Sequence, residues 1–364
     1  MKNPLLIVCL IQFLFSTCGM HNKQISRLDS KEIIKHRLTH GIGVDPFEQE
    51  IFQDSIICDL FIETQHPSNL DEIGNHIGLN NENLKERLNT LIKYGLIKKN
   101  NEDIYFSTFP IIVDHISEYR HKTRQVAIRV FPKIKNDIET ILEISKTNGW
   151  EAWNYHIIWS QLFDSQFIWF EMMDKQLVPL LTEPVWWIIY PRNSNFIGTN
   201  YYSSDFNVNF LLTVSWKPSG SNTLGWIGGQ AGYIFQKAFT NMDLQESSIQ
   251  SLSKINLLDS NLNLNIPIIS SRDVLYQELN ETAKKYCALL EKEIDLDKFD
   301  FINSDRKIIW AMIYHDISWE ILGLLADEGR IKLPKTLRVP DYLDMTGVSA
   351  LIEIYPPWKH LLGF

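Results

Sequence analysis

The stretch from residue 68 to residue 106 constrains the fold of this chain more than any other. It predicts a helix, a tight turn, a second helix and then a short β-hairpin. Ser68-Asn69 can cap the first helix, and Gly78 can end it because glycine tolerates the left-handed backbone of a helix terminus. The apolar residues of this helix recur at helical spacing: Leu70, Ile73 and Ile77.

The second helix and the hairpin follow the same logic. Asn80 or Asn81 can cap this helix, and Gly95 stops it. Its apolar stripe consists of Leu84, Leu88 and Leu91. Leu96-Ile97 then opens a strand, Asn100-Asn101 forms the turn, and the chain returns through Ile104-Tyr105-Phe106.

This order of elements resembles the winged helix-turn-helix of bacterial regulators, especially the ArsR-like type, whose sequences follow "ELA..LGLS...VS..L..L...GLI". With a first helix from Phe47 to Glu63, the resemblance covers residues 47–110. It implies a DNA-binding domain whose second helix, Asn81 to Tyr94, enters the major groove.

Charge is distributed unevenly within this region. The whole chain carries a net charge of −9, which argues against nonspecific binding of polyanions. Residues 47–106 hold 11 acids and 5 bases, and all five bases lie in the second helix or the first hairpin strand. They are Lys85, Arg87, Lys93, Lys98 and Lys99. Basic charge is thus concentrated where a winged helix meets phosphates, although an ordinary solvated helix face would have the same composition.

The expected DNA contacts divide by chemistry. Asn89 and Lys93 are the candidates for reading bases, since asparagine pairs with adenine and lysine reaches guanine. Thr90 lies on the same face. The other four basic residues would neutralise phosphates: Lys85, Arg87, Lys98 and Lys99. Glu82 and Glu86 share this face and would repel phosphate, so they argue against DNA binding.

The amino terminus leaves the compartment open. An uncharged run from Pro4 to Thr17 precedes Cys18, as in a lipoprotein signal over residues 1–18 whose cysteine is acylated. Phe15 and Thr17 depart from the residues usual before such a cysteine. Translation from Met20 would instead give a cytoplasmic protein. Residues 19–46 are polar with little periodicity and predict a tail or linker.

The remainder divides by composition. Residues 111–149 predict a helical connector. All eleven tryptophans lie between Trp150 and Trp358, so residues 150–364 predict a compact, aromatic-rich α+β domain. We expect helices over 150–173, 272–293 and 305–327, and strands over 185–190, 196–202, 208–216 and 262–269.

The sequence contains no known catalytic motif, so we expect no enzymatic activity, no cofactor and no metal. The glycines from Gly225 to Gly232 fit no nucleotide loop, and we interpret them as a packed turn. His315, with Asp316 and Glu320 on neighbouring helix turns, has ligand-like spacing, but a histidine among tryptophans favours a core residue; His156 is interpreted in the same way. Cys58 and Cys287 lie in apolar patterns and predict buried thiols.

The sequence therefore predicts an α+β protein, with an N-terminal winged helix-turn-helix followed by the larger Trp-rich domain. Its expected function is a non-enzymatic transcription regulator whose partner is double-stranded DNA. The large domain would form a homo-oligomer or bind an unidentified small effector. The alternative is a membrane-anchored lipoprotein that uses the winged helix for protein–protein contact.

Overall fold

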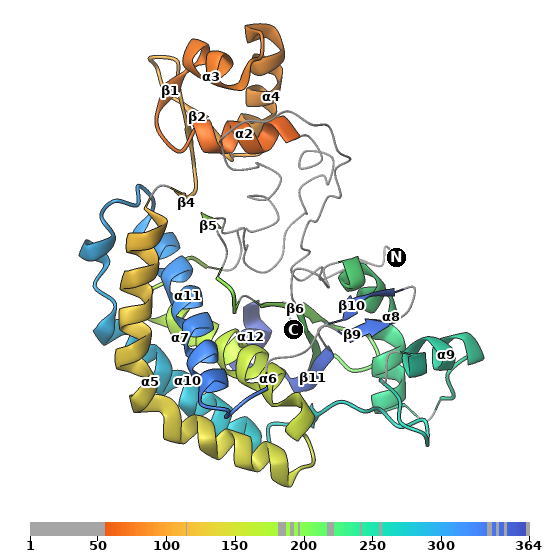
Figure 1. The fold of residues 1–364 in the computed structure, drawn as a ribbon. Helices are drawn as coiled ribbons and strands as arrows, with labels where there is room; N and C mark the ends of the chain where they lie inside the picture. The colour runs from red at the N-terminus through yellow and green to blue at the C-terminus, as the bar shows by residue number, and fades with distance from the viewer. Residues whose placement is uncertain are drawn as a thin grey trace.

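The computed structural model describes residues 55–113, 115–180, 187–189, 193–195, 197–216, 222–240, 242–254, 257–332, 337–339, 342–345 and 348–361. Its buried apolar side chains form two separate clusters. We call residues 55–111 the amino-terminal unit and residues 112–361 the carboxy-terminal unit (Figure 1). The predictions for residues 1–18 and 19–46, Cys18 included, lie outside the described residues, as do residues 47–54 of the expected first helix.

The amino-terminal unit combines three helices with a small antiparallel sheet. Its elements are α2 (Ser55–Glu63), β1 (Ser68–Asn69), α3 (Leu70–Ile77), α4 (Asn81–Lys93), β2 (Ile97–Lys99) and β3 (Ile104–Ser107). The strand order is β1-β3-β2, so β3 pairs on both sides. β1 was not expected from the sequence, because two residues are too short to show a strand pattern.

The predicted helix ends are confirmed. The Asn69 side chain accepts a hydrogen bond from Glu72 N, and the Glu72 carboxylate accepts one from Asn69 N, which is a capping box. Asn80 caps α4 through its side-chain oxygen, which accepts a hydrogen bond from Asn83 N. Gly78 and Gly95 have φ values of +78° and +71°, the backbone region that glycine adopts without strain.

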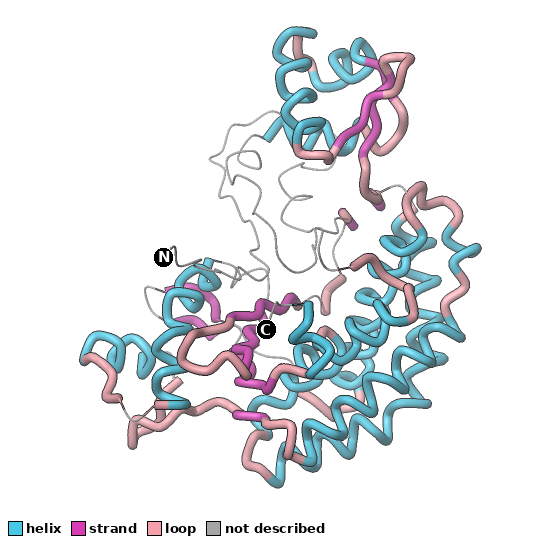
Figure 2. Tube along the Cα trace, turned by 180° about the vertical axis from the view of Figure 1, so that it is seen from behind, coloured by secondary structure: helices cyan, strands magenta, loops and turns pink. Residues whose placement is uncertain are grey.

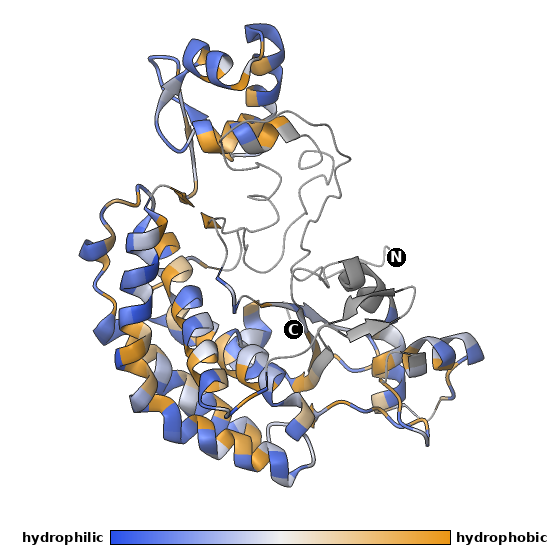
Figure 3. Cartoon of the chain, in the orientation of Figure 1, coloured by the Kyte–Doolittle hydropathy of each residue, from blue (hydrophilic) through white to orange (hydrophobic). Residues whose placement is uncertain are grey.

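The carboxy-terminal unit packs long helices together. α5 (Ile116–Thr147) lies against α10 (Val274–Glu293) and α11 (Arg306–Asp327). Figure 3 shows orange apolar stripes on the helices that pack together in this unit. α11 is the one helix among the described residues that is apolar and long enough to cross a membrane, and 78% of its apolar window is buried inside the unit.

α5 occupies the region where the sequence suggests a connector. Its helical character agrees with that expectation, but the helix does more than join two domains. Tyr119, Val130 and Ile138, all fully buried, belong to the large core of the carboxy-terminal unit. The apolar residues of α5 are spaced for burial along most of its 32 residues, so it is a core helix.

The single helix expected over 150–173 is broken. It consists of η2 (Glu151–Trp153), α6 (Asn154–His156), the π-helix η3 (Ile157–Phe163) and α7 (Gln166–Asp174). The break lies at Asp164-Ser165, where the Ser165 hydroxyl accepts a hydrogen bond from Ile168 N and so starts a new helix.

A four-stranded sheet lies beside these helices (Figure 2). Its order is β6-β7-β11-β8, from β6 (Gly198–Tyr202), β7 (Phe210–Trp216), β11 (Val348–Glu353) and β8 (Ile268–Ile269). The strand expected over 262–269 is reduced to the two residues of β8. Gly225–Gly232 lies in a helix, α8 (Asn222–Phe239), so the interpretation as a packed turn is wrong.

The other elements are α9 (Glu246–Lys254), η5 (Leu296–Phe299), β9 (Leu337–Val339), β10 (Tyr342–Met345) and α12 (Pro356–Leu361). The chain thus has the α+β composition expected.

A short parallel ladder joins the two units. β4 (Ile111–Ile112) pairs with β5 (Ile188–Ile189), with Ile111 opposite Ile188 and Ile112 opposite Ile189. Successive side chains on a strand point to opposite faces. Ile188 is buried in the cluster of the amino-terminal unit, and Ile111 packs against that cluster; Ile112 and Ile189 are buried in the other cluster. One ladder therefore supplies side chains to both cores.

Candidate nucleic-acid interface

The predicted contact residues lie on α4 and β2. α4 turns Leu84, Leu88 and Leu91 fully into the core of the amino-terminal unit, so its opposite face is presented to solvent. Five of the seven predicted residues are exposed: Lys85, Asn89, Lys93, Lys98 and Lys99. The other two, Arg87 and Thr90, are half-buried. All seven therefore lie on two consecutive elements of one small unit.

The two half-buried residues bond to their own helix. The Thr90 hydroxyl donates to Glu86 O at 3.0 Å, and Arg87 Nη1 donates to Asn83 O at 3.3 Å. The Thr90 hydroxyl oxygen keeps its acceptor capacity, so Thr90 can still serve a polar ligand on the flank of α4.

The β2–β3 hairpin is fixed by Asn100. Its side-chain oxygen accepts hydrogen bonds from Glu102 N at 2.9 Å and from Ile104 N at 3.0 Å. Asp103 then adopts a left-handed φ of +61°, which aspartate tolerates better than most residues. The turn predicted at Asn100-Asn101 is therefore confirmed.

Two lysines from different elements converge near this turn. Lys99 Nζ lies 2.7 Å from Asp103 Oδ1 and 5.5 Å from the centre of the Tyr105 ring. The hydrogen bond from Lys99 lowers the pKa of Asp103, and the positive charge of Lys85 lowers it further. Lys99 on β2 and Lys85 on α4 therefore both act on the carboxylate of Asp103.

Acids elsewhere in the unit are partly engaged within it. Glu63 pairs with His76 at 2.7 Å, and Asp71 accepts a hydrogen bond from Asn81 Nδ2 at 2.9 Å. Glu82 and Glu86 remain exposed on α4 itself. The exposed face of α4 and β2 is consequently mixed in charge.

The two histidines weighed as ligands are buried. His315 Nδ1 lies 2.7 Å from Ala311 O, and the ring contacts Trp159, Trp169, Trp187 and Trp319. Burial lowers the pKa of His156 to about 4. Among the residues that the structure describes, no group of three His, Cys, Asp or Glu side chains is placed to hold a metal ion. Both histidines are core residues, as interpreted from the sequence.

Cys287 is a buried free thiol, as expected, and burial raises its pKa to about 12. The side chain of Cys58 lies outside the described residues.

Our sequence-based predictions do not include the polar network around Asp316, which joins α5, α11 and the segment after β5. The sequence nevertheless carries a signal for it. Asp316 and Glu320 lie one turn apart on a helix that is otherwise almost entirely apolar, and buried carboxylates require partners.

No protein-family model, no curated protein and no solved structure matches this chain.

Proposed function

We propose that this chain is a DNA-binding transcription regulator whose amino-terminal unit is a winged helix-turn-helix. The element order α2-β1-α3-α4-β2-β3 supports the proposal, together with a sheet in which β1 and β2 flank β3. The observation that carries it is the placement of the cations. Every lysine and arginine between residues 55 and 110 lies on α4 or β2. The leucines of α4 pack into the core, so its polar face is exposed and can enter a groove.

In this proposal the contacts divide between bases and backbone. Asn89 and Lys93, both exposed on α4, read base edges in the major groove. Lys85, Arg87, Lys98 and Lys99 neutralise phosphates, while Thr90 contacts the backbone from the flank of the helix. Glu86, one turn before Thr90, disfavours phosphate and would tolerate only a base that donates a hydrogen bond, such as cytosine.

The carboxy-terminal unit would serve oligomerisation or effector binding rather than catalysis. A homodimer would place two α4 helices on successive turns of the duplex. All eleven tryptophans lie in this half of the chain. Their emission would therefore report effector binding there, and an effector that changes it should also shift DNA affinity, because coupling between two sites is reciprocal.

The test is binding of the full chain to the DNA that flanks its own gene. Affinity should fall with salt, each phosphate contact contributing about 0.9 to the log–log slope. Lys98→Ala should weaken binding to all sequences and lower that slope by about one contact. Asn89→Ala should cost about 1–3 kcal/mol on the preferred sequence only.

Lys284→Ala is the matched control, because Lys284 is a lysine on α10 whose ion pair, with Glu281, stays within that helix. It should leave affinity unchanged. Absence of binding to flanking DNA at low salt would remove the proposal.

A second candidate rests on the uncharged run before Cys18. In that case the chain is a lipoprotein held at a membrane by an acyl group on Cys18, and the exposed face of α4 contacts a protein instead of DNA. The mature amino terminus, measured by mass spectrometry, distinguishes the two candidates.

A further inference from the structure

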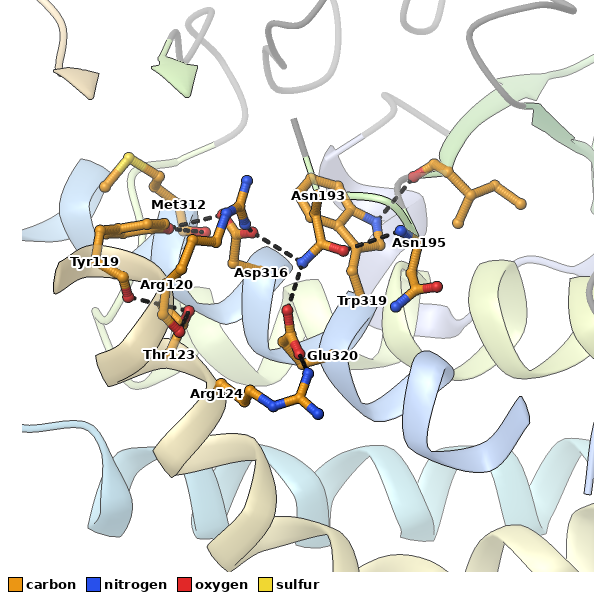
Figure 4. A network of polar contacts seen from close by, with 11 residues as sticks. Tyr119, Arg120, Thr123, Arg124, Asn193, Asn195, Met312, Asp316, Trp319 and Glu320 are labelled. Atoms are coloured by element: carbon orange, nitrogen blue, oxygen red, sulfur yellow. Dashed lines mark hydrogen bonds and ion pairs between the residues drawn. The ribbon is translucent and has the colours of Figure 1, made fainter. Parts of the chain in front are cut away.

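Both strands of the β4–β5 ladder are attached to the same stretch of α11. β4 leads into α5, whose first turns carry Tyr119 and Arg120, and β5 leads to Asn193. All three side chains bond to Asp316 on α11 (Figure 4). Asp316 thus lies where the two chain segments that tie the units together meet the large core.

α5 is attached to α11 by an ion pair and by the hydrogen bond of a tyrosine hydroxyl. Tyr119 OH donates to Asp316 Oδ2 at 2.8 Å, and Arg120 Nη1 pairs with Asp316 Oδ1. Burial raises the pKa of Tyr119, so this hydroxyl remains a proton donor. One turn further on, Arg124 Nη1 pairs with Glu320 Oε2 at 2.9 Å.

The segment after β5 is attached through Asn193. Its Nδ2 donates to Asp316 Oδ1 at 3.3 Å and to Glu320 Oε1 at 3.0 Å, and its Oδ1 accepts from Asn195 N at 3.0 Å. Trp319 Nε1 donates to Ile197 O at 3.1 Å, which fixes the next part of the same segment. Three residues of α11, Asp316, Trp319 and Glu320, therefore bind this segment at Asn193 and Ile197.

The Asp316 carboxylate is fully buried, so the cost of burying its charge depends on the groups that donate hydrogen bonds to it. A buried carboxylate is tolerated when several donors surround it, and losing one donor is costly. The network consequently favours one arrangement of β4, β5 and α11 over any arrangement in which a donor has moved away.

We propose that Asp316 and Glu320 form a latch that fixes the position of the amino-terminal unit and couples it to the large core. The coupling follows from the ladder, because Ile111 and Ile188 pack into the small core. The residues that follow the two strands, on α5 and at Asn193, are bonded to α11. A shift of α11 moves both strands together, and α4 with them. Its regulatory meaning rests on the proposed function.

The test uses the full chain and needs no DNA. Asn193→Ala removes the hydrogen bonds from Asn193 to Asp316 and Glu320 without creating a buried charge. Asp316→Asn keeps the shape of the Asp316 side chain while removing its charge. Hydrogen exchange at the amides of Ile112 and Ile188 should quicken at least about tenfold in either variant, while exchange within α10 stays unchanged.

Glu328→Gln is the matched control, because Glu328, the residue that caps the carboxyl end of α11, pairs with Lys135 of α5 about three turns beyond Asp316. It should leave exchange in the ladder unchanged. Should Asp316→Asn fail to fold, Asn193→Ala still decides the matter. Ladder exchange in Asn193→Ala equal to that of the control overturns the latch.

DNA binding supplies an independent readout. Asn193→Ala should change affinity about fivefold or more without touching α4. If the chain binds no DNA while the ladder still loosens, the proposed function fails and the latch stands. If affinity is unchanged although the ladder loosens, the latch holds the unit in place but does not couple it, and that part of the proposal is wrong.

Discussion

Lys99 Nζ and Asp103 Oδ1 lie 2.7 Å apart across the turn of the β2–β3 hairpin. If the proposed function is correct, this pair occupies a cation that a DNA phosphate would otherwise contact. Asp103→Asn should therefore raise DNA affinity and steepen the salt dependence, by up to about 0.9 in the log–log slope. Asparagine tolerates the left-handed backbone at this position, so the hairpin should keep its shape.

Glu102→Gln is the comparison for that variant, since it removes the same charge from the neighbouring residue and leaves the Lys99 pair intact. Titrations of DNA at several salt concentrations should show the larger gain for Asp103→Asn. Equal gains would mean that only net charge matters, and no gain in either would argue against a role for the hairpin.

Gly74 allows α3 and α4 to approach each other closely. A Cβ at this position would lie 3.1 Å from Leu79 O and 3.3 Å from Asn81 Oδ1. Gly74→Ala should destabilise the amino-terminal unit by about 1–3 kcal/mol, measured by chemical denaturation.

At Gly78 a side chain would be unfavourable for a different reason. A Cβ would have open space there, but φ is +78°, a backbone conformation that other residues adopt only with strain. Gly78→Asn should therefore be tolerated better than Gly78→Ala, whereas no such difference is expected at Gly74.

Ile188 and Ile189 are adjacent in sequence, are buried to a similar degree, and face different cores. Ile188→Ala should destabilise the amino-terminal unit by about 2–5 kcal/mol, although the residue lies in the other half of the chain. Ile189→Ala should act on the carboxy-terminal unit instead. Hydrogen exchange measured separately for each unit distinguishes the two effects. If both variants speed exchange in the same unit, the two isoleucines do not face different cores.

His156 makes stability depend on pH. Its folded-state pKa of about 4 lies below the ordinary value of 6.5, so between these values the unfolded chain binds the proton more tightly. Stability is complete above about pH 6.5 and should fall by about 3 kcal/mol as the pH drops toward 4. His156→Leu should flatten this part of the curve, measured by denaturant unfolding at each pH. A curve unchanged by the substitution would assign the loss to other groups.

Cys18→Ser tests the location of the protein. If residues 1–18 are a lipoprotein signal, the substitution should abolish acyl labelling and release the chain from membranes. A native chain that begins at Met20 and is never found at membranes would contradict the lipoprotein alternative.

The sequence predicts those parts of the fold that depend on neighbouring residues. Gly78 and Gly95 end helices because of their own backbone freedom, and Asn80 caps α4 from the adjacent position. The exposed face of α4 follows from its three leucines. These signals are local, so the whole candidate interface could be proposed before its geometry was known.

Features that depend on distant partners were missed or mistaken. β11 is a central strand because β7 and β8 lie on either side of it, and its apolar run alone did not distinguish it. The break at Asp164-Ser165 depends on a single capping hydroxyl within a continuous apolar stretch. Asp316 was considered only as a metal ligand, because its partners Tyr119, Arg120 and Asn193 are far away in sequence.

The β4–β5 ladder also bears on how this chain is synthesised. The ribosome releases the amino-terminal unit first, but Ile188 completes its core only after α5, η3 and α7 have been translated. A nascent chain that ends before β5 therefore carries an unfinished small core. For the same reason, residues 47–110 placed in another protein would lack the side chain that Ile188 contributes to the small core.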